Sequence, residues 1–314
     1  MQIGMVGLGR MGMNMTRRLL QGGHQVVVYN RTRDKVLEAE KEGAVGCNSL
    51  QELAPKLSPP RVVWLMLPAG KPTEDHIRSL SKLLSPGDIL VDGANTYFRD
   101  DLRREEELKP RGIHYLDAGV SGGVWGLKVG YCMMLGGDEA DFKRMEPILR
   151  TLAPKDGYLH CGPTGAGHFV KMVHNAIEYA LLEAYGEGFE MLKVSPYSEH
   201  LDLGKIAHVW NQGSVVRSWL LELLEAAFLK DHDLSSVPGS VEDSGEGRWA
   251  VQEAVASGVS VTGIAHALFK RFESRQPNLF SNKVIAVLRQ AFGGHALTTM
   301  PTASKEGDPA HPAS

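Results

Sequence analysis

The stretch QIGMVGLGRMGMNMTRRLLQGG, residues 2–23, decides the fold. It opens with an apolar run typical of a buried strand and continues with Gly7, Gly9 and Gly12 in the pattern G-x-G-x-x-G. A helix-like segment follows and stops at two glycines, and HQVVVYN then reads as a second strand. A lone glycine pattern is weak evidence, but between a strand and a helix of a βαβ unit it predicts a dinucleotide-binding loop.

Each glycine of this loop has a physical task. Gly7 permits the tight turn, Gly9 lets the backbone approach a pyrophosphate, and Gly12 allows close packing of helix and strand. The helix that follows offers free N–H groups and the positive end of its dipole to the phosphates. We therefore expect the cofactor to contact the whole loop, which comprises Gly7, Leu8, Gly9, Arg10, Met11 and Gly12.

The end of the second strand bears on the choice of cofactor. NAD-binding folds carry an acidic residue there, which hydrogen-bonds the ribose 2′-OH, whereas this chain has Asn30, Arg31, Thr32 and Arg33. Neutral and basic groups suit a 2′-phosphate, which an arginine can hold with two hydrogen bonds. The sequence predicts NADP, and NAD remains the alternative if Arg31 and Arg33 are only solvated loop charges.

Strand-like runs alternate with helical or polar stretches through the rest of the first half, at 61–70, 88–95, 114–123 and 131–137. This alternation predicts a mostly parallel, doubly wound α/β sheet of Rossmann type. Such sheets bind ligands beyond the carboxyl ends of their strands. The residues expected at that edge are Leu67, Pro68, Ala69, Asn95, Ser121, Gly122 and Gly123.

The second half reads as all-α. We expect a nucleotide-binding domain over residues 1–165, a helical domain over 166–300 and a flexible, Pro- and Ser-rich tail over 301–314. An apolar stripe that predicts a packed helix core consists of Leu220, Leu221, Leu223, Leu224 and Phe228. The helix-like segments cover 166–193, 199–211, 214–230, 246–256, 260–273 and 280–292.

Composition excludes several classes of function. The chain of 314 residues is 43% hydrophobic and has a net charge of −3 without a basic block, which argues against nucleic acid as a partner. Its three cysteines, Cys47, Cys132 and Cys161, are far apart, so neither a disulfide framework nor a zinc site is indicated and no metal is expected. No apolar run reaches the length of a membrane span, and we expect a cytoplasmic protein.

KMVHNAIEY, residues 171–179, carries five different polar groups in nine residues. At about 100° per residue they fall within an arc of roughly 140° on a helix. Two interpretations stand: a plain amphipathic surface helix, or a helix with an active site along one edge. The polar residues of the arc are Lys171, His174, Asn175, Glu178 and Tyr179.

Five motifs together resemble one family. GLGRMGMNM, NRT, DGANTYFRDD, DAGVSGG and GAGHFVKMVHNAIEY are similar, in this order, to the signatures of the decarboxylating 6-phosphogluconate dehydrogenases, here in a short form with a smaller helical domain. The resemblance implies oxidative decarboxylation of 6-phosphogluconate to ribulose 5-phosphate and CO₂, with reduction of NADP, in the pentose phosphate pathway. Two rivals remain: another β-hydroxyacid dehydrogenase that acts on a small unphosphorylated acid, and a non-catalytic NADP-binding sensor.

The resemblance also implies roles for single residues. Lys171 would be the base that takes the 3-hydroxyl proton, and Glu178 the acid that protonates C1 of the enediol. For this task the pKa of Lys171 must fall from about 10.4 toward neutrality. The residues implied to hold the sugar acid are Asn95, Ser121, Gly122, Gly123, His174 and Asn175, and those implied to hold its phosphate are Tyr179, Arg271 and Arg289.

Two further segments bear on the substrate end of the site. RQAFGGH supplies Arg289 and His295, which in the resembled family enter the active site of the other subunit, so a homo-oligomer with a shared site is implied. The alternative is an ordinary basic helix end. EDSGEGRW departs from the family pattern, because Ser244 stands where a substrate-binding lysine is expected and Glu246 adds acidic charge nearby.

Overall fold

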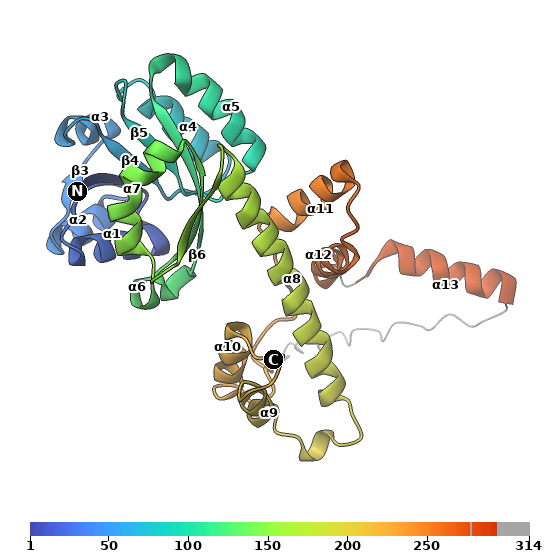
Figure 1. Ribbon diagram of the computed structural model, residues 1–314. Coiled ribbons are helices and arrows are strands. Elements are labelled where there is room, and N and C mark those ends of the chain that lie inside the picture. The colour runs from blue at the N-terminus through green and yellow to red at the C-terminus, as the bar shows by residue number, and fades with distance from the viewer. Residues whose placement is uncertain (277, 294–314) are drawn as a thin grey trace, which may run out of the picture.

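The computed structural model describes residues 1–276 and 278–293, and within them an eight-stranded sheet precedes a helical region (Figure 1). The strands run in the order β3-β2-β1-β4-β5-β6-β7-β8, and all neighbours pair in parallel except β6 with β7. The predicted fold class is confirmed. The strands are β1 Gln2–Val6, β2 Gln25–Tyr29, β3 Val45–Cys47, β4 Val62–Leu65, β5 Ile89–Asp92, β6 His114–Ser121, β7 Cys132–Gly137 and β8 Tyr158–Gly162.

Helices cover both faces of the sheet, so its central strands are buried on both sides. Along β4, Val62 and Trp64 join one apolar core, whereas Val63 and Leu65 join the other. This explains why the strand is a continuous apolar run rather than an alternating one. The helices of this half are α1 Arg10–Gln21, α2 Arg33–Lys41, α3 Leu50–Leu53, α4 Lys71–Leu80, α5 Phe98–Leu108, α6 Gly126–Val129 and α7 Glu139–Leu152.

A single long helix, α8 Ala166–Lys193, connects the sheet to the rest of the chain (Figure 1). Its 28 residues correspond to about 42 Å of rise. Pairs of helices pack against its middle and its far end, whereas α13 extends away with exposed side chains over 280–291. The remaining helices are α9 Leu203–Trp210, α10 Trp219–Phe228, α11 Glu246–Ser257, α12 Thr262–Ser274 and α13 Phe280–Gly293.

The first turn of α8 is fixed to the sheet by Asp117 of β6. Its carboxylate accepts the backbone N–H groups of Gly165 and His168, each at 2.7 Å, which satisfies donors that a helix start otherwise leaves free. Gly167 allows this approach, because a Cβ there would lie 2.5 Å from the carbonyl oxygen of Met134. The position and direction of α8 are therefore set by the sheet.

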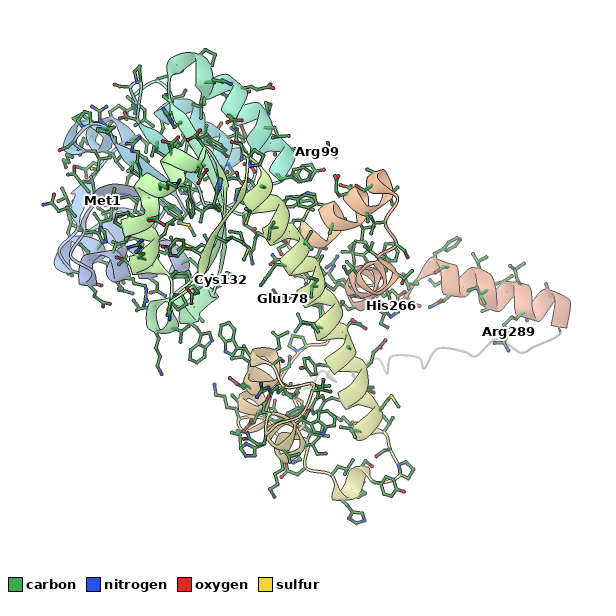
Figure 2. All side chains as sticks on the ribbon, viewed as in Figure 1. Met1, Arg99, Cys132, Glu178, His266 and Arg289 are labelled. Atoms are coloured by element: carbon green, nitrogen blue, oxygen red, sulfur yellow. The ribbon has the colours of Figure 1, made fainter. Side chains whose placement is uncertain are left out.

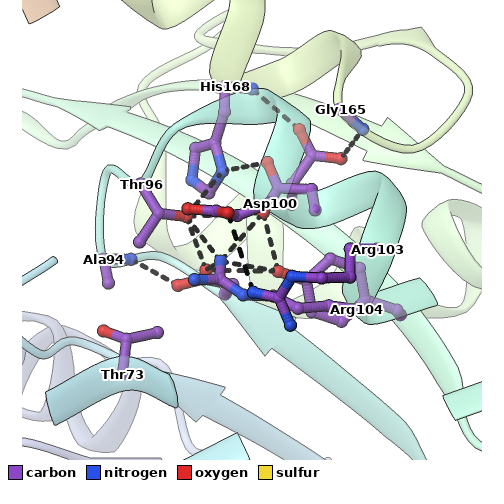
Figure 3. A network of polar contacts seen from close by, with 12 residues as sticks. Thr73, Ala94, Thr96, Asp100, Arg103, Arg104, Gly165 and His168 are labelled. Atoms are coloured by element: carbon purple, nitrogen blue, oxygen red, sulfur yellow. Dashed lines mark hydrogen bonds and ion pairs between the residues drawn. The ribbon is translucent and has the colours of Figure 1, made fainter. Parts of the chain in front are cut away.

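A buried polar network lies beside this junction (Figure 3). Arg104 of α5 donates to Asp92 at 2.7 Å and to Asp101 at 3.2 Å, and Asp101 in turn contacts His168 Nδ1 at 2.7 Å. Asp92, Asp101 and His168 lie close enough together to hold a metal ion, but the guanidinium of Arg104 already supplies a cation to both carboxylates. The network joins α5, the end of β5 and the start of α8.

The network predicts a pH dependence of stability. Burial alone would lower the pKa of His168, but the charge and hydrogen bond of Asp101 outweigh it and raise the pKa to about 9. Because the folded pKa exceeds the unfolded value of about 6.5, this contribution is fully present below pH 6.5 and is lost as pH rises through 9. The expected loss is about 3 kcal/mol, from about 1.4 kcal/mol per pH unit.

Urea unfolding at pH 6, 7.5 and 9.5 checks this expectation. His168→Gln keeps a polar side chain but cannot titrate, so the difference in unfolding free energy between it and the native protein isolates the histidine. That difference should shrink toward pH 9.5. A difference that stays constant with pH would show that His168 does not carry the proton.

Candidate active site

A cleft of about 940 Å³ lies between the carboxyl edge of the sheet, α8 and α10. The glycine-rich loop contributes Gly9 and Gly12, and α8 contributes residues from Val170 to Leu181 on its polar and apolar sides. A Cβ at Gly9 would meet no atom within 4 Å, so the backbone there is open to a ligand. Of the residues expected from the sequence, those that line the cleft are Gly9, Met11, Gly12, Leu67, Asn95, Ser121, Gly122, Gly123, Lys171, His174, Asn175 and Glu178.

Lys171 is the buried amine of this cleft. Only 5% of the residue is exposed, and its Nζ donates to Asn175 Oδ1 at 2.7 Å and lies 3.4 Å from His174 Nδ1. Burial lowers the pKa of the Lys171 amine, against the opposing charges of Glu178 and Glu246. An amine with a lowered pKa that is already held by hydrogen bonds can take up a proton from a bound hydroxyl group.

Glu178 lies two turns further along the same edge of α8 and lines the same cleft (Figure 2). His174 Nδ1 is 3.0 Å from Asn175 Oδ1, so these two residues form one polar strip with Lys171. The arrangement places an amine and a carboxyl group on one wall, separated by about 10 Å of helical rise. In a short polyhydroxy acid bound in this cleft, the amine and the carboxyl group could each reach a different carbon.

The cofactor end is organised by the side chain of Asn30. Its Oδ1 accepts the N–H of Leu8 at 2.9 Å and its Nδ2 donates to the carbonyl of Thr32 at 3.1 Å, so it connects the glycine-rich loop to the end of β2. Arg33 pairs with Glu40 at 3.2 Å. Arg31 is exposed and forms no ion pair within the part of the chain that the structure describes.

A second polar group lies on the other side of Asn95, at the start of α11. Glu246 is 4% exposed, accepts from Asn95 Nδ2 and accepts from Ser244 Oγ at 2.5 Å. The backbone N–H of Ser244 donates to Tyr179 Oη at 3.3 Å. The guanidinium of Arg271 stacks on the same tyrosine, with its Cζ 3.4 Å from the centre of the ring. Asn95 therefore lies between the cleft and a group that contains two of the predicted phosphate ligands.

Two of the three arginines near Tyr179 are already paired with a carboxylate. Arg248 donates to both carboxylate oxygens of Asp243, at 2.7 and 3.0 Å, and Arg275 donates to the same carboxylate at 3.0 Å. Arg271 donates instead to the backbone carbonyl of Glu242 at 3.0 Å. Among residues 1–276 and 278–293, Arg271 forms no ion pair with a carboxylate, so its charge is available for an anion.

Family models match both halves of the chain. Residues 2–162 match the NAD binding domain of 6-phosphogluconate dehydrogenase, and residues 167–300 match the C-terminal domain of 6-phosphogluconate dehydrogenase. The chain belongs to the 6-phosphogluconate dehydrogenase family. The resemblance of the five sequence motifs is thereby confirmed, and so is the prediction that the chain is an enzyme with a nicotinamide dinucleotide cofactor.

Relatives of the 6-phosphogluconate dehydrogenase family cover nearly the whole chain. A provisionally named 6-phosphogluconate dehydrogenase of Bacillus subtilis, YqeC, is 44% identical over 94% of this chain and 99% of its own length. The NAD(+)-dependent, decarboxylating 6-phosphogluconate dehydrogenase of Haloferax volcanii is 41% identical over 94% and 98%. The solved 6-phosphogluconate dehydrogenase of Plasmodium falciparum superimposes with a TM-score of 0.80 at 28% identity, over 97% of this chain and 67% of that one.

Several residues predicted for the site are not among those that line this cleft. Pro68 and Ala69 follow β4 but do not line the cleft. Arg289 is exposed on α13, away from the cleft of its own chain (Figure 2), and His295 falls outside the described residues, as does the predicted tail over 301–314. The remaining predicted residues outside the cleft lining are Gly7, Leu8, Arg10, Asn30, Arg31, Thr32, Tyr179 and Arg271.

The sequence patterns do not predict the apolar side of the cleft. Trp125, Trp219 and Leu223 line it, together with Ile177 and Leu181 of α8. Part of the predicted core stripe on α10 is therefore wrong: Leu221, Leu224 and Phe228 pack inward, whereas Leu220 and Leu223 face the cleft. The i, i+3 spacing of Leu220 and Leu223 marks a second helical face, but periodicity alone does not reveal what that face meets.

Gly119 of β6 sets the position of Lys171. A Cβ built on Gly119 would overlap the Cβ of Lys171 and lie 2.9 Å from its Cγ. We expect Gly119→Ala to displace the amine and lower kcat at least about tenfold, because misplacement of a catalytic group by about 1 Å is costly. Gly186→Ala on α8 is the matched control, since a Cβ there meets nothing within 4 Å. Equal kcat for both variants, measured by NAD(P)H absorbance, would contradict this role.

Proposed function

We propose that the enzyme oxidises 6-phosphogluconate at C3 and decarboxylates the product to ribulose 5-phosphate and CO₂, a step of the pentose phosphate pathway. The observation that carries the proposal is the buried amine of Lys171, with its lowered pKa, on the same cleft wall as Glu178. The Haloferax volcanii relative is named for the decarboxylating reaction, and the Plasmodium falciparum structure is described with 6-phosphogluconate as its substrate.

The residues of the cleft fit the three steps of this reaction. The bound nicotinamide ring supplies the hydride acceptor. Neutral Lys171 takes the proton of the 3-hydroxyl group while Asn175 holds its Nζ at 2.7 Å. The resulting ammonium then donates a hydrogen bond to the C3 oxygen as the C1 carboxylate leaves, which stabilises the developing enolate charge. Glu178 finally donates a proton to carbon on the same side.

We propose that Gly9, Gly12 and the N-terminal end of α1 hold the pyrophosphate, and that Arg31 holds the 2′-phosphate of NADP. The exposed guanidinium without an ion pair among the described residues supports NADP, whereas the name of the Haloferax volcanii relative supports NAD(+) for that protein. The comparison of kcat/KM for the two cofactors decides. A preference for NAD would overturn the assignment of Arg31.

We also propose that two chains share the site. Within one chain, the apolar side chains of α13 and a row on α8 remain exposed, among them Phe280, Ile285, Leu288, Ile177 and Leu181. A second chain that covered them could bring its Arg289 to the phosphate end near Tyr179. Full activity of a monomer in solution would contradict the shared site. We further propose that the chain divides at residue 165 into a nucleotide-binding domain and a helical domain.

One assay separates the proposed reaction from its rivals. Reduced cofactor is followed by absorbance with 6-phosphogluconate as substrate, and released CO₂ is detected in the same reaction. A dehydrogenase for a small unphosphorylated acid would turn over that acid and release no CO₂ from 6-phosphogluconate. A non-catalytic sensor would bind NADP tightly and turn over neither.

In the described part of the chain, no helix combines the length and apolar character that a membrane span needs.

A further inference from the structure

We propose that Glu246 is a positioning residue, which turns the amide of Asn95 so that Oδ1 faces the cleft as a hydrogen-bond acceptor. This inference rests on the proposed function, since it deepens the same site. It concerns the segment EDSGEGRW, in which Glu246 has no role in the mechanism described above. The consequence is that the atom of Asn95 that faces the cleft is an acceptor, which receives a donor from the ligand.

The burial and direction of Glu246 are unusual for an acid in the first turn of a helix. Such residues are generally solvated and interact with the positive end of the helix dipole. Glu246 is instead 4% exposed and reaches across from α11 to Asn95, which follows β5 in the sheet domain. Ser244 Oγ donates to its second oxygen at 2.5 Å, so both carboxylate oxygens are engaged and the side chain is fixed.

The chemistry of the two groups determines the orientation of the amide. An ionised carboxylate only accepts hydrogen bonds, so the NH₂ group of Asn95 must face Glu246. Its Oδ1 then points the other way, toward the cleft that Asn95 lines, and accepts no hydrogen bond from residues 1–276 or 278–293. Asn95 has a φ of 54°, in the left-handed region, so its backbone is also held in a special conformation.

A cleft-facing Oδ1 selects for a donor, and two ligand groups can supply one. The first is a hydroxyl group of the sugar acid, and the second is the carboxamide N–H of the nicotinamide. The two differ in what they affect: a hydroxyl contact is seen in the KM for the sugar acid, whereas a carboxamide contact is seen in the Kd of the cofactor.

The charge of Glu246 has a separate effect that identifies it. Glu246 favours the protonated form of Lys171 and so opposes the burial that lowers the pKa of Lys171. Glu178 acts in the same direction, and Cys132 of β7 contributes as well. Removal of the Glu246 charge should therefore move the acid limb of the kcat/KM profile to lower pH. This shift reports the charge of Glu246 alone, whereas the orientation of the Asn95 amide is reported by the KM for the sugar acid and the Kd of the cofactor.

The test is a double-mutant cycle of Asn95→Ala with Glu246→Ala. Glu246→Ala should raise either the KM for the sugar acid substrate or the cofactor Kd about tenfold, and the same change should have less than about a twofold effect once Asn95 is alanine. Glu253→Ala is the matched control, because Glu253 of α11 pairs with Arg99 at 2.7 Å across the same face without contacting Asn95. That variant should leave both constants unchanged.

Glu246→Gln provides the rescue. Its Oε1 can still accept from Asn95 while Nε2 donates to Ser244 Oγ, so KM and Kd should stay within about threefold of the native values while the acid limb shifts. Independent effects of the two alanine substitutions, or a Gln variant that behaves like the Ala variant, would overturn the proposal.

Urea unfolding of the same variants requires no activity. The shifts of the unfolding midpoint should be non-additive if Asn95 and Glu246 form a pair, and additive shifts would also overturn the inference. If the native protein does not turn over 6-phosphogluconate, the proposed function fails, and the unfolding cycle together with the cofactor Kd still decides the role of Glu246.

Discussion

Lys171→Met is expected to lower kcat for the oxidation of 6-phosphogluconate at least about 100-fold, because general base catalysis contributes about 10²–10⁴-fold. Methionine retains the length and apolar stem of lysine and brings no charge into the buried position. The glycine-rich loop is untouched. The Kd of the cofactor, measured by quenching of tryptophan fluorescence, should therefore change less than about threefold.

Two comparisons make this result specific to Lys171. Lys193→Met at the end of the same helix removes an exposed amine that donates to the carbonyl of Asp233, and it should leave kcat unchanged. Glu178→Gln should slow product formation more than substrate binding, because Glu178 is assigned the later proton transfer to carbon. Retained oxidation in Lys171→Met, with a normal cofactor Kd, would remove Lys171 from the role of base.

Local patterns in the sequence predict much of the sheet and the helix that carries Lys171 and Glu178. Gly7, Gly9 and Gly12 specify a backbone conformation within six residues, and the helix over 166–193 follows from uninterrupted periodicity. The strip from Lys171 to Glu178 could be placed on one edge because helical spacing alone brings i, i+3, i+4 and i+7 together. Both features depend on contacts between neighbours in the chain.

The parts that sequence reasoning missed depend on distant contacts. β3 has only three residues, and β8 at the sheet edge contains His160 and Cys161, so neither has a strong strand pattern. Glu246 reads as a surface acid until its contact with Asn95, 151 positions earlier, is known. Likewise, Asp117 reads as part of a strand, and its role in fixing the start of α8 becomes visible only when the two elements meet.

Arg104→Met is expected to lower the free energy of unfolding by about 3–5 kcal/mol, because it removes one partner of a buried ion-pair network. The guanidinium is 1% exposed and donates to Asp92, Asp101 and Glu74. Without it, Asp92 loses its cation and Asp101 keeps only the imidazolium of His168. Arg103→Met is the matched control, since the adjacent arginine forms exposed pairs with Glu74 and Glu107 and should cost less than about 1 kcal/mol.

The pH dependence of the Arg104→Met variant identifies the cause of its instability. Carboxylates that lose a cation in a buried site gain a raised pKa, so the folded variant binds more protons than the unfolded chain and becomes less stable as pH rises. Its deficit relative to the native protein should therefore be smaller at pH 5 than at pH 8, as measured by urea unfolding. A deficit independent of pH would indicate lost packing of the arginine side chain instead. The network also includes Thr96, which is adjacent to Asn95, and His168, which lies three residues before Lys171. Loss of Arg104 should therefore disturb the positions of Asn95 and Lys171, so that kcat falls together with stability.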